Sequence, residues 1–254
     1  MNVWDKFMDE LALWQGAGKT ATLWWRDDDA VAVTPELLKL LDVASITGTA
    51  PGMAVIPDLL TADAATELTG AFKKCPDAAV LLHGFAHVNH APNNQKSCEF
   101  DDLRNQDVMR DELQSGIKTL SQFNRFLPVF VPPWNRVGDK FINLLPPSGI
   151  KALSTFGLRS QKHPRPGLYQ VNTHVDIIDW KGCRGFVGLE QALFVATHHL
   201  KQKRLSKVDD EPTGVLSHHL VHDNGAWDFL HEFMTRTQNH PAVQWLTPQQ
   251  VFRK

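Results

Sequence analysis

The stretch Leu81-Leu82-His83-Gly84-Phe85-Ala86-His87 joins an apolar run to two histidines that are separated by three residues. The apolar run, Ala78 to Leu82, predicts a buried strand, and the glycine after His83 predicts that the chain turns into a loop there. Two imidazoles at this spacing can lie on one face of a helical turn and bind the same metal ion. Parallel α/β proteins place their functional residues in such loops at strand ends. His83 and His87 are therefore candidate metal ligands, with a buried or surface histidine as the ordinary alternative.

The composition is that of an ordinary soluble globular protein. The 254 residues carry a formal net charge of −2, with 43% hydrophobic and 21% charged residues. This balance gives no indication of binding to nucleic acid or to an anionic membrane surface. No apolar run is long enough to span a bilayer, and Met1–Trp14 lacks the pattern of a signal peptide. Because Cys75, Cys98 and Cys183 also suggest no disulfide framework, we expect a cytoplasmic protein, and the sequence leaves its oligomeric state open.

Predicted strands and helices alternate along the chain. Apolar runs predict strands at Thr22–Arg26, Met53–Ile56, Ala78–Leu82, Val129–Val131, Lys151–Ser154, Gly214–Leu216 and Val243–Leu246, with a hairpin or an extension formed by Tyr169–Asn172 and His174–Ile178. Helical spacing and capping residues predict an opening amphipathic helix marked by Trp4, Phe7, Met8, Leu11 and Trp14, and further helices at Pro35–Ile46, Thr61–Lys74, Glu99–Phe123, Lys140–Leu145, Leu189–Lys203 and Ala226–Arg236. Right-handed crossovers between such strands generate a parallel sheet, and seven or eight units fit a closed or nearly closed barrel. No linker divides the chain, so we expect a single domain over residues 1–254, with an N-terminal helical extension at about residues 1–18.

Five of these apolar runs end in polar clusters, which a barrel of parallel strands would gather at one mouth. The clusters are Arg26-Asp27-Asp28-Asp29, His83-Gly84-Phe85-Ala86-His87, Val131-Pro132-Pro133-Trp134-Asn135-Arg136, Asp176-Ile177-Ile178-Asp179-Trp180, and Leu216-Ser217-His218-His219 followed by His222-Asp223. Each has a structural explanation by itself, because aspartates cap helices, Pro-Pro-Trp forms a rigid turn and histidines are often hydrogen-bonded in cores. Their occurrence together in one chain indicates a functional site.

In this order the clusters resemble the motifs of the NodB-type polysaccharide deacetylases, the carbohydrate esterase family four group. Arg26–Ala30 falls on the family's Thr-Phe-Asp-Asp-Gly, His83–His87 on His-Ser/Thr-x-x-His, and Val131–Trp134 on part of Arg-Pro-Pro-Tyr. Asp176–Trp180 matches Asp-x-x-Asp-Trp, and Leu216–His218 matches Leu-x-His. The resemblance extends over about residues 20 to 250, and the second, fourth and fifth motifs are the more specific in combination.

The resemblance implies a single distorted seven-stranded (β/α) barrel, NodB-like in fold. The implied activity is a metal-dependent hydrolase that removes an N-acetyl group from an amino sugar of a polysaccharide or of its cytoplasmic precursor. One divalent metal, Zn²⁺ or alternatively Co, Ni, Fe or Mn, would be bound by Asp29, His83 and His87. The implied catalytic groups are Asp28 as general base, His218 as general acid and the backbone N–H of Trp134 as oxyanion donor. Supporting or substrate-binding roles are expected of Asp176, Trp180, Asn135, Arg136 and His222.

The residues suit this chemistry. Two histidines and one carboxylate leave an open position on a tetrahedral Zn²⁺-like ion, as catalytic sites require. Such an ion lowers the pKa of bound water and polarises the acyl carbonyl. Asp28 is adjacent to the ligand Asp29 and could take the proton of the water, while His218 could protonate the departing amine.

The chain departs from the family pattern at several positions. Val131 replaces the motif-three arginine that pairs with the catalytic base, so a cationic neighbour of Asp28 must come from Arg136, which we favour, or from Arg26. Gly84 cannot make the hydrogen bond of a serine or threonine side chain, and Asp27 adds a negative charge where the family has an apolar residue.

Three histidine and aspartate positions allow more than one interpretation. His219 stands where the family usually has aspartate. His90 is either a fourth ligand or substrate contact, or an exposed loop residue. His222 and Asp223 form either a substrate-facing dyad or the capped start of a helix.

Two other functions remain open on the same residues. The protein could be an amidohydrolase that acts on a small non-sugar amide. It could also be a catalytically altered relative that keeps the metal and only binds carbohydrate. The presence of Asp28 and His218, and not only of the three ligands, argues against the second alternative.

Overall fold

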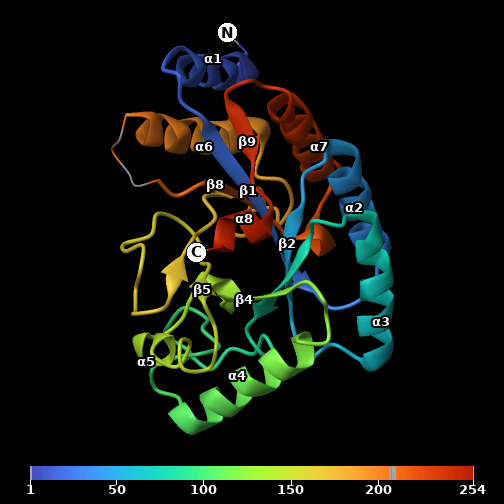
Figure 1. The fold of residues 1–254 in the computed structure, drawn as a ribbon, viewed down its shortest axis with the longest axis vertical. Helices are drawn as coiled ribbons and strands as arrows, with labels where there is room; N and C mark the ends of the chain where they lie inside the picture. The colour runs from blue at the N-terminus through green and yellow to red at the C-terminus, as the bar shows by residue number, and fades with distance from the viewer. Residues whose placement is uncertain (1, 206, 208–209, 254) are drawn as a thin grey trace.

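The central element of the fold is strand β1 (Ala21–Ala30), which is paired on both sides (Figure 1). The structure is a computed structural model that describes residues 2–205, 207 and 210–253. The side chains of Trp24 and Trp25 in β1 are fully buried, as expected of a parallel strand that is covered on both faces. Side chains alternate along a strand, so Arg26 and Asp28 point to the same face of the sheet. This alternation decides the local chemistry of the site described below.

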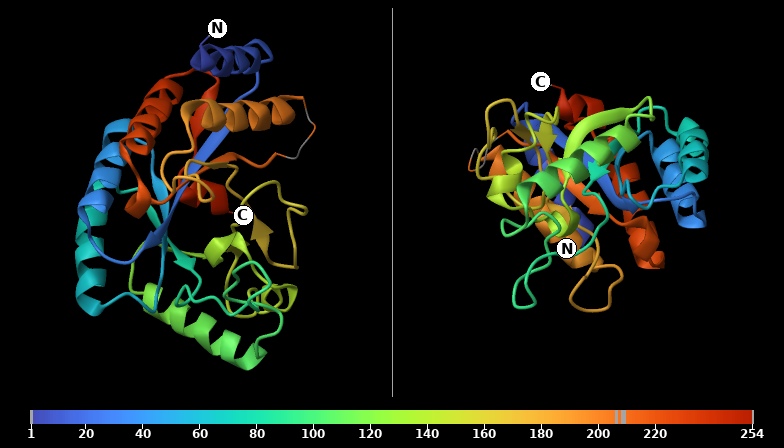
Figure 2. Two further views of the ribbon diagram at one scale, coloured as in Figure 1. Left: turned by 180° about the vertical axis from the view of Figure 1, so that it is seen from behind. Right: turned by 90° about the horizontal axis from the view of Figure 1, so that it is seen from below.

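Nine strands form one parallel sheet within the described residues (Figures 1 and 2). Their order is β6-β5-β4-β3-β2-β1-β8-β7, and β9 pairs with the start of β1. Besides β1 they are β2 (Pro51–Val55), β3 (Ala79–His83), β4 (Phe126–Val131), β5 (Ala152–Leu153), β6 (Tyr169–Gln170), β7 (Val175–Asp176), β8 (Thr213–Ser217) and β9 (Val243–Trp245). The sheet curls with helices around it into an incompletely closed barrel, which confirms the expected fold class with a path of eight strands instead of seven.

Strands β6 and β7 lie at opposite edges of the sheet, although few residues separate them. β6 pairs with β5, and β7 pairs with β8. Between them the carbonyl of Asn172 accepts a hydrogen bond from Trp24 Nε1 at 3.1 Å, and the N–H of His174 donates to the carbonyl of Gly214 at 2.7 Å. Of the two arrangements that the sequence allows here, the hairpin is therefore wrong. The segment instead leads the chain from one edge of the sheet to the other.

The helices lie on the outside of the sheet (Figure 1). They are α1 (Val3–Gly16), α2 (Pro35–Thr47), α3 (Ala62–Ala71), α4 (Gln106–Leu120), α5 (Asp139–Ile142), α6 (Leu189–Arg204), α7 (Asn224–Gln238) and α8 (Pro248–Phe252), with 3-10 turns η1 (Phe72–Lys74), η2 (Pro133–Asn135) and η3 (His219–Val221). The expected caps are present, because Thr34 accepts from the N–H of Leu37 and Thr61 from that of Ala64, both at 3.1 Å. Within the described part of the chain, no helix has the length and apolar character that crossing a bilayer requires.

One helix begins later than its sequence predicts. The expected helix at Glu99–Phe123 starts only at Gln106, where Asn105 caps it by accepting from the N–H of Asp107 at 2.8 Å. Glu99 does not join the helix because its carboxylate is turned inward and accepts hydrogen bonds from backbone amides of the loop after β3. These buried hydrogen bonds of Glu99 therefore outweigh the helical pattern at the N-terminal end of the expected helix.

Helix α1 packs against α6 and α7 at the end of the molecule where β1 begins (Figure 1). Trp4, Phe7 and Leu11 on its apolar face are buried. Phe7 lies 5.2 Å from the ring of Phe233 in α7, and Glu10 accepts from Arg204 Nε at 2.7 Å. The amphipathic helix expected at the N-terminus is thus part of the core.

Candidate active site

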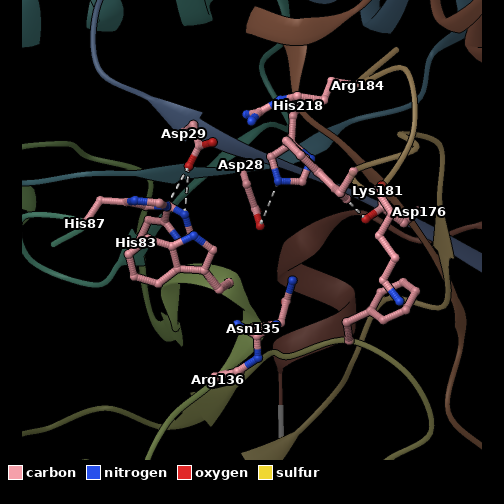
Figure 3. Close-up of a pocket in the computed structure, with 13 residues that line it drawn as sticks. Asp28, Asp29, His83, His87, Asn135, Arg136, Asp176, Lys181, Arg184 and His218 are labelled. Atoms are coloured by element: carbon pink, nitrogen blue, oxygen red, sulfur yellow. Dashed lines mark hydrogen bonds and ion pairs between the residues drawn. The ribbon is translucent and has the colours of Figure 1, made fainter. Parts of the chain in front are cut away.

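One pocket lies where several strands of the sheet end (Figure 3). It has a volume of about 580 Å³, within the range of ~300–1,000 Å³ that is typical of small-molecule sites. Its walls come from the ends of β1, β3, β4, β7 and β8 and from the loops that follow them. The residues that line it are Asp28, Asp29, His83, His87, Trp134, Asn135, Arg136, Phe156, Asp176, Trp180, Lys181, Arg184 and His218. Ten of the eleven site residues expected from the sequence are among them, and the exception is His222.

The three expected metal ligands converge on one point of this pocket. Asp29 Oδ1 lies 3.0 Å from His83 Nε2 and 3.4 Å from His87 Nε2, and one potential ligand atom from each residue lies within 4.8 Å of the others. His83 Nδ1 lies 3.0 Å from the carbonyl of Val131, so Nδ1–H donates there, and Nε2, which faces Asp29, is the potential ligand atom. A second contact of this kind fixes the ring of a metal-binding histidine. The three atoms are therefore arranged as one side of a metal site.

The charges of Asp29 and His87 also favour cation binding. His83 differs, because burial would lower its pKa but the hydrogen bond with Asp29 and the nearby carboxylates raise it overall, so His83 must lose a proton when a cation binds. Burial alone would raise the pKa of the Asp29 carboxyl, but the hydrogen bond and the charge of His83 hold the pKa well below its ordinary value. Burial and the neighbouring charge of His83 lower the pKa of His87. A metal ligand must be an ionised carboxylate or a neutral imidazole, and both shifts are in that direction.

Glu99 holds the loop that carries His87, and sequence reasoning missed it. Its carboxylate accepts hydrogen bonds from the N–H groups of Phe85 at 3.1 Å, Ala86 at 2.6 Å and His87 at 2.9 Å. Burial raises the pKa of Glu99 overall, although these amides oppose the shift. The signal in the sequence was Gly84, whose added Cβ would overlap the Glu99 carboxylate and Pro133. Glu99 thus occupies the space beside Gly84 where the family pattern has a serine or threonine side chain.

Arg26 is the cationic partner of Asp28, so the preference for Arg136 was wrong. Arg26 Nε donates to Asp28 Oδ1 at 2.8 Å and Nη2 donates to Oδ2 at 3.0 Å, with both residues buried. The remaining donors of Arg26 bind the backbone and side chain of Ser154 and the Oδ1 of Asn135, the last at 2.6 Å. Arg136 instead donates to the carbonyl of Ser97 at 2.9 Å. Asp28 therefore receives a bidentate pair from the same face of its own strand.

His218 lies on the other side of Asp28. Its Nε2 is 3.9 Å from Asp28 Oδ2, and its ring meets the edge of Trp180 at 4.6 Å between centroids. Asp176 accepts from Trp180 Nε1 at 2.9 Å and from the N–H of Ile178 at 3.0 Å. Burial raises the pKa of Asp176. Asp176 and Trp180 thus form a support beside the candidate acid.

A second buried ion pair lies on the opposite face of β1. Asp27 accepts from Ser217 Oγ at 2.6 Å, and from the N–H of His219 at 3.1 Å and its Nδ1 at 2.5 Å. Burial would raise the pKa of Asp27, but the charge and hydrogen bond of His219 lower it, and Asp27 in turn raises the pKa of His219 against the effect of burial. Asp27 and His219, the two residues that depart from the family pattern here, are therefore hydrogen-bonded to each other.

His222 does not line the pocket. Its ring lies 4.4 Å from that of Trp227, and burial lowers its pKa to about 4. Asp223 caps α7 by accepting from the N–H of Ala226 at 2.8 Å and also accepts from that of Phe186 at 2.9 Å. Of the two interpretations that the sequence allows, the capped helix start is confirmed for Asp223. His90 is exposed and does not belong to the cluster of Asp29, His83 and His87.

Backbone strain is concentrated at this pocket. Among the described residues, five that are not glycine have a positive φ, and all five line the pocket: Asp29, His87, Trp134, Asn135 and Arg184. Each left-handed residue of this kind costs about 1–2 kcal/mol, and such conformations cluster at functional sites. Trp134, in the turn after β4, has a φ of 54°, and its ring lies 4.4 Å from that of His87.

Comparison with solved structures places this arrangement in a known fold. No family model and no curated sequence matches the chain. A peptidoglycan N-acetylglucosamine deacetylase is 15% identical with a TM-score of 0.57, and the match covers 92% of this chain and 89% of that one. The chitin deacetylase of Colletotrichum lindemuthianum is 10% identical with a TM-score of 0.56, covering 93% and 89%. A family 4 acetyl xylan esterase from Clostridium thermocellum, in complex with cobalt, is 10% identical with a TM-score of 0.54, covering 91% and 90%.

The chain has the NodB-like fold of carbohydrate esterase family 4. In a NodB-like barrel the parallel strands all end at the same mouth, which explains why clusters distributed from Asp28 to His218 line one pocket. The fold does not decide the reaction. The chemistry must be argued from the groups that the pocket brings together.

Proposed function

We propose that the protein is a metal-dependent hydrolase that removes the N-acetyl group of an amino sugar. The observation that carries the proposal is the position of Asp28 between two groups. Figure 3 shows the donor set of Asp29, His83 and His87 on one side of Asp28 and His218 on the other, with His218 Nε2 at 3.9 Å from Asp28 Oδ2. Amide hydrolysis needs a base for water and an acid for the leaving amine on either side of the same carbonyl carbon.

The donor set fits a divalent cation of the Zn²⁺ type. Two imidazoles and one carboxylate are a usual ligand combination for catalytic zinc, and they leave a coordination position open. The hydrogen bond from His83 Nδ1 to the Val131 carbonyl fixes the ring of one ligand, and the amide contacts of Glu99 hold the backbone that carries a second one, His87. When bound, such a cation polarises the acyl carbonyl and lowers the pKa of water.

The residues of the chain perform the remaining steps. Asp28, held in place by Arg26, accepts the proton of the attacking water. The backbone N–H of Trp134 stabilises the negative charge on the acyl oxygen, and a preorganised donor of this kind contributes about 3 kcal/mol. His218 then donates a proton to the amine that departs, and acetate and the free amino sugar are the products.

Two alternatives use the same pocket. An amidohydrolase for small non-sugar amides would share all the catalytic groups and differ only in its substrates. A protein that only binds carbohydrate would need the ligands but not the pairing of Asp28 with Arg26 or the approach of His218. The buried and fully hydrogen-bonded Arg26–Asp28 pair favours catalysis over binding alone.

Release of acetate from N-acetylated sugars, measured together with metal content, tests the proposal. We expect turnover that chelation abolishes and added Zn²⁺ or Co²⁺ restores. Asp28→Asn should lose activity by a factor of about 100 or more while it retains the metal, whereas His83→Ala and His87→Ala should lose the metal. Asp228→Asn on the exposed face of α7 is the matched control and should change neither quantity.

The outcomes separate the alternatives. Turnover of small acylated amides but not of sugars would favour the amidohydrolase. Binding of metal and sugar without turnover would favour the binding protein. Full turnover by Asp28→Asn would remove Asp28 from the role of base.

A further inference from the structure

Three cationic side chains line the pocket, and the proposed reaction uses none of them. Lys181 and Arg184 come from the loop between β7 and α6, and Arg136 comes from the turn after β4. All three are exposed. Over the residues that the structure describes, no carboxylate forms an ion pair with any of the three. Arg184 only approaches the ring of Trp180 at 5.9 Å, and Arg136 donates to a backbone carbonyl.

The acidic residues of the pocket do not balance these cations, because each already has a partner. Asp28 is paired with Arg26, and Asp29 lies against His83 and His87. Asp176 is buried and accepts from the amide of Ile178 and the indole of Trp180. The cationic groups of Arg136, Lys181 and Arg184 are therefore available to attract an anion from solution.

The loop that carries Lys181 and Arg184 is held in a defined shape. Asp179 Oδ1 accepts from the N–H groups of Lys181 at 3.2 Å and Gly182 at 2.9 Å. The N–H of Arg184 donates to the carbonyl of Asp179 at 2.9 Å, and Arg184 has a φ of 56°. A residue with a Cβ adopts this conformation at a cost of about 1–2 kcal/mol. This turn therefore holds the backbone of the short segment from which both Lys181 and Arg184 reach the pocket.

The position of these cations indicates which part of the substrate they meet. Figure 3 shows Lys181 and Arg184 on the side of the pocket that holds His218 and Asp176, with Asp29, His83 and His87 on the opposite side. In the proposed reaction His218 protonates the departing amine, which belongs to the sugar. The sugar therefore lies on the His218 side of the pocket, and the acetyl group points toward Asp29, His83 and His87. The ring of Trp180, 39% exposed, lies 4.6 Å from that of His218, and Phe156, 45% exposed, also lines the pocket, so both offer apolar surface for a sugar ring.

We infer that the substrate is an acidic N-acetylated sugar, whose phosphate or carboxylate group binds Lys181 and Arg184, with Arg136 contributing to the positive field. The inference rests on the proposed deacetylation and specifies the class of its substrate. Guanidinium and ammonium groups together recognise phosphate and carboxylate oxygens through charge-assisted hydrogen bonds. A neutral polysaccharide would leave these cations with nothing to bind.

Acetate release from matched sugars tests the inference. The substrates are N-acetylglucosamine, its 1-phosphate and 6-phosphate esters, and N-acetylmuramic acid, which carries a carboxylate. We expect kcat/KM for an acidic sugar to exceed that for N-acetylglucosamine by about tenfold or more, since a hydrogen bond to a charged group is worth about 1.5–3 kcal/mol. The preference should shrink as salt rises, because these cations are exposed. The phosphate and carboxylate arms identify which anion is recognised.

A double variant, Lys181→Gln with Arg184→Gln, measures the contribution of the loop. The ratio of kcat/KM between the acidic and the neutral sugar should fall by about tenfold. Lys118→Gln, at an exposed position on α4, is the matched control and should keep the ratio of the unaltered protein. Thermal unfolding of all variants checks that the fold is retained.

Two results would overturn the inference while the proposed function stands. One is turnover of neutral sugars as fast as of every acidic sugar. The other is a preference for acidic sugars that survives in the double variant. Absence of acetate release from all the sugars, with metal bound, is a different outcome that removes the proposed function and this inference with it.

Discussion

At the scale of single residues, the cation that pairs with the proposed base, Asp28, comes from the same strand as Asp28 itself. Arg26 and Asp28 are two positions apart on β1, so their side chains leave the same face of the sheet. The guanidinium group is then close enough for a bidentate pair with the carboxylate. Val131, at the position of the motif-three arginine, is fully buried and apolar. Arg26 thus supplies to Asp28 the positive charge that the resemblance assigns to an arginine at position 131.

Arg26 should be essential for both stability and turnover. Arg26→Gln leaves Asp28 as a buried carboxylate without its charged partner, and breaking such a pair costs about 3–5 kcal/mol. We expect a loss of this size in the free energy of unfolding, measured in urea, and a fall in kcat of about 100-fold in acetate release. Arg110→Gln is the control, because Arg110 pairs with the exposed Asp107 on α4 and does not line the pocket.

A relocated arginine would test this interpretation further. Val131→Arg in the Arg26→Thr background returns the side chain to the position that the family pattern uses. Partial recovery of kcat over Arg26→Thr alone is the expected result. If Arg26→Gln kept full activity, the ion pair would have no role in holding the base.

At the scale of elements, the loop after β3 depends on a residue that is remote in the sequence pattern. The Glu99 carboxylate accepts hydrogen bonds from three consecutive backbone N–H groups, and the absence of a side chain at Gly84 leaves space for this carboxylate. His83 and His87 could be predicted as a pair because the spacing of two histidines can be recognised directly in the sequence. The sequence pattern placed Glu99 in a helix, because nothing local distinguishes an inward glutamate from one at an exposed helix start.

Glu99→Gln should weaken metal binding without unfolding the protein. The carboxylate oxygen that now accepts from the N–H of Phe85 becomes an amide group that cannot accept, so the loop with His87 is less well held. Altering an outer contact of a metal ligand typically costs about 10–100-fold in affinity. Titration of the metal-free protein with Zn²⁺ measures the change, and Glu67→Gln on the exposed face of α3 is the control. An unchanged affinity would show that the loop keeps its shape without these hydrogen bonds.

At the scale of the whole molecule, the order of strands and helices could be predicted, because hydrophobic runs and capping residues are local signals. The path of β6 and β7 to opposite edges of the sheet could not, since strands of two residues carry too little pattern to fix their partners. Motifs predicted that the side chains of Asp28, Asp29, His83, His87 and His218 would lie together, and all five line one pocket. The partner of Asp28 was not predicted, because Arg26 and Arg136 differ only in their placement in space.

Helix α1 belongs to the core at the end of the molecule away from the pocket. Along β1, eight residue steps separate Ala21, at the end near α1, from Asp29, which corresponds to about 26 Å. Phe7→Ala should therefore lower the free energy of unfolding by about 3–5 kcal/mol, as expected for a large buried aromatic side chain. Its kcat for acetate release, measured well below the unfolding transition, should be unchanged. Leu13→Ala on the exposed face of α1 serves as the control, because Leu13 is 53% exposed. A matching loss of kcat in folded Phe7→Ala would mean that the packing of α1 is coupled to the mouth of the barrel through β1, and the two ends of the strand could then not be treated as independent.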